Sequence, residues 1–148
     1  SILTSNLEHI DRAVDAILRT KKRKVGLLGL SFKAGTDDLR ESPLVHLAKR
    51  LLGEGCELQI WDDNVTLGRL IGSNRQFIQD VIPHIGSLLR DDFEDVVRLS
   101  EVIVIGTKAV SLRLLAPLLN EKQHVVDLVH LGKGQRAQGS SSYEGICW

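Results

Sequence analysis

The chain has 148 residues, of which 43% are hydrophobic and 26% charged, and its 19 basic and 19 acidic residues give a formal net charge of zero. This length predicts one domain with a single sizeable core, and the balanced charge argues against a nucleic-acid or anionic-membrane partner, which would favour a clustered basic face. Two distant cysteines make no disulfide framework, and neither a signal peptide nor an apolar stretch of membrane length is visible, so we expect a cytoplasmic protein with no membrane partner.

The first predicted element is an amphipathic helix that ends near Thr20. Its apolar residues alternate between spacings of four and three and form one narrow seam: Leu3, Leu7, Ile10, Val14 and Ile17. Two heptads are too short for an independent coiled coil. The seam therefore either packs on the chain's own sheet or belongs to a longer helix that bridges domains and subunits.

A basic run, Lys21 to Lys24, follows this helix. Cations at a helix C-terminus interact favourably with the helix dipole, so we interpret the run as a solvated helix end. A targeting role is the alternative.

The next predicted element is a buried, central strand of a parallel sheet. Gly26 and Gly29 lie within a short apolar run that Lys24 precedes and Ser31 follows. The apolar residues of this run are Val25, Leu27, Leu28 and Leu30.

A helix is predicted to begin after Ser42. Ser42 is a favoured N-cap residue, Pro43 suits the first helical position, and Gly53 marks the end. The apolar residues between them follow helical spacing: Leu44, Val45, Leu47, Ala48, Leu51 and Leu52.

The loop between this strand and this helix is the strongest candidate for a ligand site. In a dinucleotide-binding fingerprint the turn is tight, and three glycines let the backbone touch the pyrophosphate. Here eleven residues separate Leu30 from Ser42, so side chains must do the binding. Lys33 can neutralise a phosphate as a point charge, and Arg40 can hold two of its oxygens in a fixed fork.

The same loop has a simpler interpretation as a solvated surface loop. Three acids accompany its basic residues and can pair with them: Asp37, Asp38 and Glu41. Such exposed pairs are common and contribute little free energy.

The rest of the chain alternates between predicted strands and helices, which indicates a doubly wound (Rossmann-like) α/β sheet with helices on both faces, preceded by the N-terminal helix. Residues Gly132 to Ser142 are predicted to form a loose loop. The predicted elements are a strand at Cys56–Trp61, helices from about Asn64 and about Arg75, a short strand near Ile85–Leu89, a helix at Asp92–Arg98, a buried strand at Val102–Ile105, a helix at Val110–Leu119 and the last parallel strand at His124–Val129.

Ligands in such sheets bind beyond the carboxyl ends of the strands. This rule places the Ser31–Glu41 loop, Asp62, Thr107 and the region of Asp127 along one rim. An acid after the second strand often holds a ribose hydroxyl, but the glycine turn that should accompany it is absent. Two roles stay open: a ribose contact, or helix capping by Asp62, Asp63 or Asn64.

Neither cysteine has the setting of a nucleophile. Cys56 opens the second strand and is predicted to be a small buried thiol, and Cys147 belongs to the terminal EGICW, where a docking tail is the favoured interpretation. The histidines show no metal-ligand spacing, so we predict no metal site: His9, His46, His84, His124 and His130.

The stretch KVGLLGLSFKAGTDDLRESP resembles the signature that opens the C-terminal domain of the UDP-glucose/GDP-mannose dehydrogenase family. Two further stretches are similar to its GDP-mannose branch: GSNRQFIQDVIPHIGSLL, from Gly72 to Leu89, and EGICW, from Glu144 to Trp148. The resemblance covers nearly the whole chain.

The resemblance implies an enzyme that oxidises the C6 hydroxyl of a nucleotide sugar, GDP-mannose or UDP-glucose, to a carboxylate in two NAD-dependent steps through a cysteine thioester. It implies that Lys33 contacts the sugar nucleotide, that Phe32 lines the same pocket, and that Arg40 reaches the NAD held by an N-terminal domain. The family's catalytic cysteine motif is absent here, so no catalytic residue is assigned and we expect this fragment to be inactive alone.

The resemblance also implies how the chain is organised. Residues 1–22 are the end of a central helix that links domains and builds a homodimer, and residues 23–148 are the sugar-nucleotide-binding domain. The N-terminal and central domains are then the missing partners of this fragment.

Two rivals come from other classes. A receiver module also has a doubly wound sheet with paired acids, a threonine and a lysine, which Asp37, Asp38, Thr107 and Lys133 imitate, but the acids lie too far beyond Leu30. A stand-alone nucleotide-binding module without chemistry is the other alternative.

Overall fold

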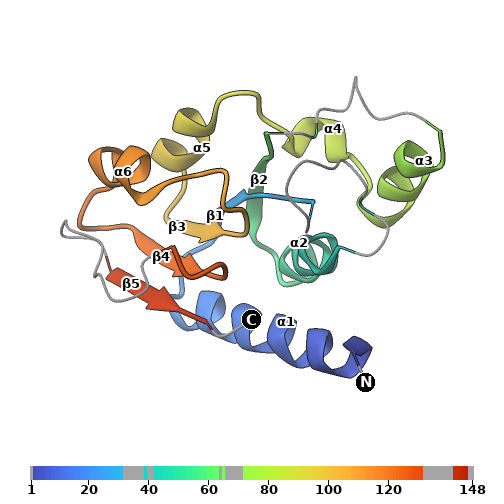
Figure 1. Ribbon diagram of the computed structural model, residues 1–148, viewed down its shortest axis with the longest axis horizontal. Coiled ribbons are helices and arrows are strands. Elements are labelled where there is room, and N and C mark those ends of the chain that lie inside the picture. The colour runs from blue at the N-terminus through green and yellow to red at the C-terminus, as the bar shows by residue number, and fades with distance from the viewer. Residues whose placement is uncertain are drawn as a thin grey trace.

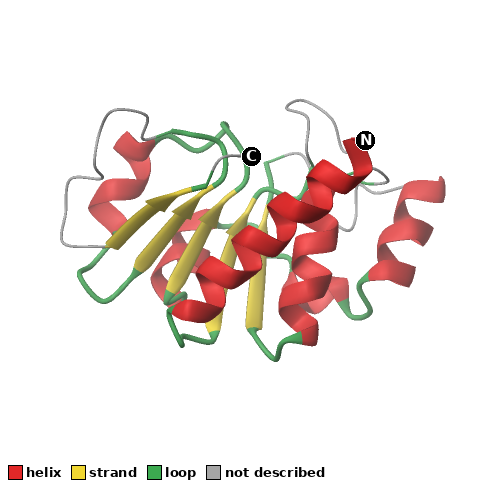
Figure 2. Cartoon of the chain, turned by 90° about the horizontal axis from the view of Figure 1, so that it is seen from below, coloured by secondary structure: helices red, strands yellow, loops and turns green. Residues whose placement is uncertain are grey.

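The computed structural model describes residues 2–31, 39, 42–63, 65, 72–131 and 142–146. In this part of the chain five strands form one parallel sheet in the order β2-β1-β3-β4-β5 (Figure 1), and Figure 2 shows their arrows pointing towards one edge of the sheet. The doubly wound α/β fold predicted from the sequence is confirmed. The strands are β1 (Lys24–Leu28), β2 (Glu57–Trp61), β3 (Val102–Ile105), β4 (His124–Asp127) and β5 (Ser142–Gly145).

Helices cover both faces of this sheet (Figure 2). One face packs against α1 and α2, and the other packs against α5, α6 and η2. Two separate clusters of buried apolar side chains form as a result, one on each face. The helices are α1 (Ile2–Arg19), α2 (Pro43–Gly53), α3 (Gly72–Val81), α4 (Ile85–Leu88), α5 (Phe93–Leu99), α6 (Leu112–Leu115) and the short 3₁₀ helix η2 (Ala116–Leu118).

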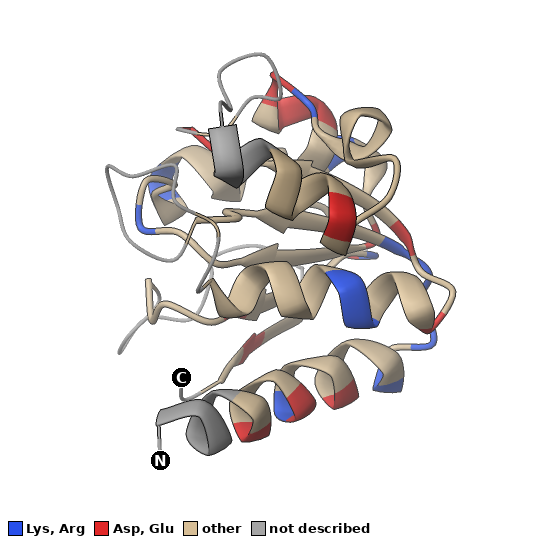
Figure 3. Cartoon of the chain, turned by 90° about the vertical axis from the view of Figure 1, so that its right-hand side faces the viewer, with Lys and Arg blue, Asp and Glu red and all other residues tan. Residues whose placement is uncertain are grey.

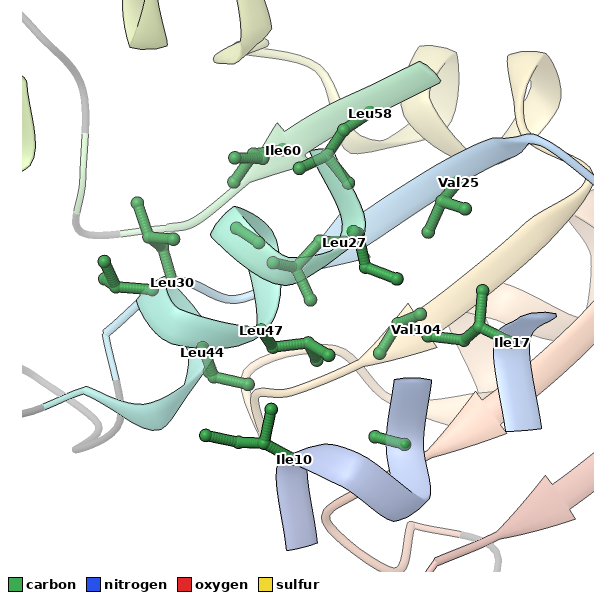
Figure 4. Packing of buried hydrophobic residues seen from close by; sticks show 14 of the residues in the cluster. Ile10, Ile17, Val25, Leu27, Leu30, Leu44, Leu47, Leu58, Ile60 and Val104 are labelled. Atoms are coloured by element: carbon green, nitrogen blue, oxygen red, sulfur yellow. The ribbon is translucent and has the colours of Figure 1, made fainter. Parts of the chain in front are cut away.

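The first strand and the helix after it form as predicted. β1 lies between β2 and β3 and is buried from Val25 to Leu28. Ser42 is the N-cap of α2, because its side-chain oxygen accepts a hydrogen bond from the Leu44 amide, and Pro43 occupies the first helical turn. The spacing of apolar residues along α2 turns one side of the helix towards β1 and β2 (Figure 4).

The apolar seam of α1 packs on the chain's own core along its second half. Ile10, Val14 and Ile17 are buried in the same cluster as Val25 and Val104, and Figure 4 shows Ile10 and Ile17 facing the sheet side of that cluster. This finding supports packing on the chain's own sheet for the second half of the seam. Leu7, one turn earlier, is 51% exposed, so the core of the domain does not cover the seam at this position.

Two ion pairs join α1 to the rest of the molecule. Arg50 on α2 pairs with Asp11 at 2.6 Å, and Arg19 pairs with Glu144 on β5 at 3.3 Å. All four side chains are exposed, so each pair contributes little to stability. Blue and red residues are interspersed along α1 in Figure 3, in keeping with the zero net charge of the chain.

The short strand predicted near Ile85–Leu89 is wrong. Residues Ile85–Leu88 form the single helical turn α4, closed by a hydrogen bond from the Leu89 amide to the Ile85 carbonyl. His84, directly before this turn, adopts a φ of 65°, which is not a strand conformation, and Gly86 is a poor strand former. Leu89 makes an isolated parallel bridge with Ile60.

The helix predicted at Val110–Leu119 is interrupted. Ser111 caps α6, which lasts one turn before the chain tightens into η2. Pro117 explains the change, because its ring has no amide to donate and clashes with the carbonyl four residues earlier.

The prediction that His124–Val129 is the last strand is also wrong. β4 ends at Asp127, and β5 adds a further parallel strand at the edge of the sheet, paired along its length with β4. β5 begins at Ser142, the residue at which the predicted loose loop ends.

The basic run follows α1, as predicted, and its last residue, Lys24, is the first residue of β1. Lys21 has a φ of 60° and ends the helix, and Lys22 donates from its ammonium to the carbonyl of Lys122. Within the described ranges, no helix is long and apolar enough to cross a membrane.

Candidate functional site

The candidate site lies at the carboxyl edge of the sheet, where β1, β2, β3 and β4 end. The described residues at this rim are Gly29 to Ser31, Asp62, Gly106 with Thr107, and Asp127. The sequence predicted that Asp62, Thr107 and the Asp127 region share one rim with the loop after β1, and the strand ends bring these residues to the same edge.

Asp62 holds the first residues of the loop after β1. One carboxylate oxygen, Oδ2, accepts hydrogen bonds from the Leu30 amide at 2.7 Å, the Ser31 amide at 2.9 Å and the Ser31 hydroxyl at 3.1 Å. Asp62 is only 4% exposed, so these donors replace the water that the carboxylate loses. These bonds give Asp62 a role beyond the two that the sequence left open, helix capping and a ribose contact: it fixes the start of the loop.

Ser42 holds the other end of the same loop. Its hydroxyl donates to the Leu30 carbonyl at 2.5 Å, while its amide donates to the carbonyl of Leu39. Leu39 is fully buried and belongs to the core cluster that also contains Leu30 and Leu44. The segment from Ser31 to Ser42 is therefore anchored at its start, at Leu39 and at its end.

At the rim, the backbone after β1 and the backbone after β3 approach each other closely. Gly29 has a φ of +112°, and a Cβ at this position would lie 2.9 Å from the Gly106 carbonyl carbon and from Thr107. The Gly29 amide donates to the Trp61 carbonyl at 2.6 Å, so this conformation links β1 to β2 as well as to the end of β3. Glycine is the residue that adopts this φ without steric cost.

Thr107 turns the chain after β3. Its hydroxyl accepts a hydrogen bond from the Ala109 amide at 3.2 Å, a turn typical of threonine. Of the four residues that imitate a receiver site, Thr107 alone is described, and Asp37, Asp38 and Lys133 lie outside the described residues.

Asp127 is a fully buried acid that ties β5 to the sheet. Its Oδ1 accepts from the Val129 amide at 3.0 Å, and its Oδ2 accepts from the Tyr143 hydroxyl on β5. The sequence placed Asp127 on the rim but missed the bond with Tyr143. No local pattern predicted it, because Tyr143 lies on a strand that the sequence did not reveal.

Asp63 lies beside Asp62 and faces solvent. Partial burial and the neighbouring charge of Asp62 raise the pKa of the Asp63 carboxyl, while its own backbone hydrogen bond lowers it. The pair thus places one buried, bonded carboxylate and one exposed carboxylate at the end of β2.

The three predicted ligand contacts, Phe32, Lys33 and Arg40, lie outside the described residues, as does Cys147. Cys56 is described and is buried, as predicted, one residue before β2. Burial raises the pKa of the Cys56 thiol, Arg23 opposes this rise, and Glu54 adds to it. A thiol of this kind is a poor nucleophile at neutral pH, which agrees with a structural role.

The matching family model is described as the UDP-glucose/GDP-mannose dehydrogenase family, UDP binding domain, and it covers residues 26–132. This range begins within β1 and includes the loop after it and the whole of β2, β3 and β4.

A curated relative gives a match over the whole chain. The GDP-mannose 6-dehydrogenase of Pseudomonas aeruginosa is 46% identical over 148 residues, which are 100% of this chain and 33% of the relative. The chain thus spans about a third of the length of the relatives that it matches.

Two solved structures are similar in fold. A ternary complex of GDP-mannose dehydrogenase from Pseudomonas aeruginosa superimposes with a TM-score of 0.80 at 45% identity, over 100% of this chain and 33% of that one. The UDP-glucose dehydrogenase of Pyrobaculum islandicum superimposes with a TM-score of 0.68 at 25% identity, over 99% of this chain and 31% of that one.

Proposed function

The chain belongs to the UDP-glucose/GDP-mannose dehydrogenase family, and on that premise we propose that it is the nucleotide-sugar-binding domain of an NAD-dependent GDP-mannose 6-dehydrogenase. The observation that carries the proposal is the match to GDP-mannose 6-dehydrogenases along the entire chain, at 46% identity for one of them. The reaction is the oxidation of GDP-mannose to GDP-mannuronate, a polysaccharide precursor, by two hydride transfers to NAD.

In this proposal Lys33 and Phe32 contact the nucleotide sugar. Phe32 follows directly on Ser31, which Asp62 holds through two hydrogen bonds. Lys33 is one residue further along the chain, two positions after Ser31 at the carboxyl edge of the sheet. A flexible ammonium at that edge can neutralise a diphosphate as a point charge.

Arg40 contacts NAD in this proposal. It is bonded directly to the buried Leu39 and precedes Ser42 by two residues, so its backbone is tethered to two fixed points. An arginine offers a rigid fork that matches the oxygens of a pyrophosphate.

Residues 1–22 are then the end of the helix that leads from a central domain and contributes to a homodimer, and residues 23–148 are the sugar-nucleotide domain. The catalytic cysteine and most of the NAD site belong to the N-terminal and central domains. Such an enzyme uses cytoplasmic NAD, and this fragment alone catalyses no oxidation.

Calorimetric titration tests the ligand assignment. The 148-residue chain is titrated with GDP-mannose, UDP-glucose and NAD in separate experiments, together with the Lys33→Ala variant. We expect GDP-mannose to bind and UDP-glucose to bind more weakly. We expect Lys33→Ala to lose about 2 kcal/mol of GDP-mannose binding, because it removes a charge-assisted contact.

Lys49→Ala is the matched control, because Lys49 is an exposed lysine on α2 away from the rim. Tighter binding of UDP-glucose than of GDP-mannose would reassign the substrate to a UDP-sugar. GDP-mannose binding that Lys33→Ala leaves unchanged would contradict the role of Lys33.

A further inference from the structure

The amino edge of the sheet, opposite the candidate site, carries two adjoining hollows. One has a volume of about 490 Å³ and lies where β1, β3 and β4 begin; the other, of about 420 Å³, lies beside the start of β2. They share Lys24, Leu99 and Ser100 along their walls, so they adjoin, and together they are called the amino-edge trough. Figure 2 shows this edge as the ends of the strands without arrowheads.

Positive charge exceeds negative charge in the larger hollow. Two glutamates line it, against four basic side chains: Lys22, Lys24, Arg98 and Lys122. Arg98 pairs with Glu94 at 3.3 Å, but both side chains are exposed, so the pair is weak and exchangeable. Among the described residues, Lys24 and Lys122 form no ion pair. In a chain of zero net charge, this excess is a local feature that favours an anionic ligand.

An exposed apolar side chain lies where the two hollows meet. Leu99, the last residue of α5, is 59% exposed, which makes it the most exposed large hydrophobic side chain of the described residues. The smaller hollow beside it is lined by three further leucines, Leu52, Leu58 and Leu88. An apolar group of a ligand can therefore remove Leu99 from water and enter the smaller hollow.

A buried hydrogen-bond acceptor in the smaller hollow lacks a donor. The side-chain oxygen of Gln59, Oε1, is buried, and no donor in the described part of the chain bonds to it. The Ser100 hydroxyl, which lines the same hollow, is already used, because it donates to the Val96 carbonyl. A buried acceptor without a donor is uncommon, and an N–H group of a ligand would satisfy it.

We propose that the amino-edge trough binds an acidic peptide segment of another protein, one that carries an apolar side chain next to two or more carboxylates. The apolar side chain packs on Leu99 in the smaller hollow, a peptide N–H donates to Gln59 Oε1, and the carboxylates pair with Lys24 and Lys122. Inorganic phosphate or a nucleic acid would pair with the lysines of the trough. It would leave Leu99 exposed to water and Gln59 Oε1 without a donor. The trough is remote from the carboxyl edge, so this inference does not depend on the proposed function.

A selection with a random peptide library on phage tests the proposal with the 148-residue chain as bait. We expect the enriched peptides to place an apolar residue beside a cluster of Asp or Glu. A synthetic peptide of the enriched sequence, labelled with a fluorophore, then gives the affinity by anisotropy.

The affinity should fall about tenfold in the Lys24→Glu, Lys122→Glu double variant, through lost ion pairs and charge repulsion, and about tenfold in Leu99→Ser, through lost apolar contact. The Lys49→Glu variant on α2 should leave it unchanged. All substituted side chains are exposed, so a thermal melt checks that each variant keeps its fold. In an NMR titration the side-chain amide of Gln59 should shift in both chains, and in Leu99→Ser the same shift should need about tenfold more peptide.

Three results would overturn the proposal. The first is enrichment of peptides without acidic residues, or no enrichment. The second is a peptide affinity that the charge-reversed double variant leaves unchanged. The third is an oligothymidylate that binds more tightly than the peptide and equally well to Leu99→Ser, because the cations would then serve a nucleic acid.

Discussion

At the carboxyl edge of the sheet, the acids Asp62 and Asp127 are buried and accept hydrogen bonds from the chain, whereas at the amino edge Lys24 and Lys122 are exposed and form no ion pair within the described residues. Both edges belong to the same four strands. They differ in what their charges contact: at one edge the partners are backbone amides and hydroxyls, and at the other the partner is solvent.

The difference separates two uses of charge in one domain. A buried carboxylate is costly unless it is fully bonded, so Asp62 and Asp127 fix the positions of loops and strands. An exposed lysine adds little to stability and can exchange water for a ligand. Substitutions at the carboxyl edge should therefore change stability strongly, and substitutions at the amino edge should change it little.

The largest expected effect is at Gly29. Gly29→Val forces a β-branched side chain into a φ of +112° and against the backbone of Gly106, at 2.9 Å from the new Cβ. We expect a loss of about 4 kcal/mol in the free energy of unfolding, from backbone strain together with overpacking. Urea denaturation followed by circular dichroism measures it.

The matched glycine control is Gly53→Ala. Gly53 ends α2, and a Cβ there would meet nothing within 4 Å, so we expect a gain of about 0.5 kcal/mol. Equal changes in the free energy of unfolding at Gly29 and Gly53 would contradict the prediction, because they would show that the close backbone contact at Gly29 does not disfavour a side chain.

Removal of the Asp62 carboxylate should have the next largest effect. Asp62→Ala leaves the buried amides of Leu30 and Ser31 without an acceptor, so we expect a loss of about 3 kcal/mol. Hydrogen exchange should also accelerate at those two amides before the rest of β1. Asp91→Ala, at an exposed carboxylate, is the control. The same loss there would contradict the assignment of the Asp62 effect to its buried hydrogen bonds.

Cys56 lies at the wall of the smaller hollow and allows a pH test. Because burial raises the pKa of its thiol, the folded chain keeps that proton at pH values where the unfolded chain has lost it. The folded state then binds more protons, so the free energy of unfolding falls as the pH rises above about 8.5.

Subtraction isolates this contribution from other titrating groups. Urea unfolding is measured from pH 7 upward for the wild type and for Cys56→Ala. The free energy of unfolding of the wild type minus that of Cys56→Ala should shrink as the pH rises. A difference that stays constant or grows would contradict a raised thiol pKa.

The smallest expected effect is at the amino edge. Arg98→Gln removes an ion pair between two exposed side chains, so we expect a loss of less than about 0.5 kcal/mol. A loss comparable to that of Asp62→Ala would erase the contrast between the two edges. Thermal melts at low and high salt measure the change and its screening.

Much of the fold was predictable because local chemistry and tertiary packing agree. The buried run of β1, the Ser42 cap and Pro43 at the start of α2 follow from steric and hydrogen-bonding preferences of single residues. The errors arise where the two disagree. Ser142–Gly145 has no β-branched residue, and it becomes a strand because β4 offers a free edge and Asp127 binds Tyr143.

The candidate site was predictable in place but not in detail. The rule for parallel sheets located the rim, and the resemblance supplied Phe32, Lys33 and Arg40, which stay predictions. The role of Asp62 could not be derived, because its hydrogen-bond donors lie about thirty residues earlier in the chain, at Leu30 and Ser31. A bond of this range depends on the pairing of β1 with β2, which sequence spacing does not encode.

The interior position of β1 has a consequence for how the protein is made. On the ribosome β1 emerges first, yet its two neighbours are β2 and β3, and Val25 pairs with both Leu58 and Val102. One side of β1 must therefore wait unpaired until β3 has left the exit tunnel. Distant parallel pairings of this kind fold slowly, and an unpaired apolar strand favours aggregation in the meantime. The nascent chain thus depends on rapid completion of β3, or on a chaperone that covers β1 until β3 arrives.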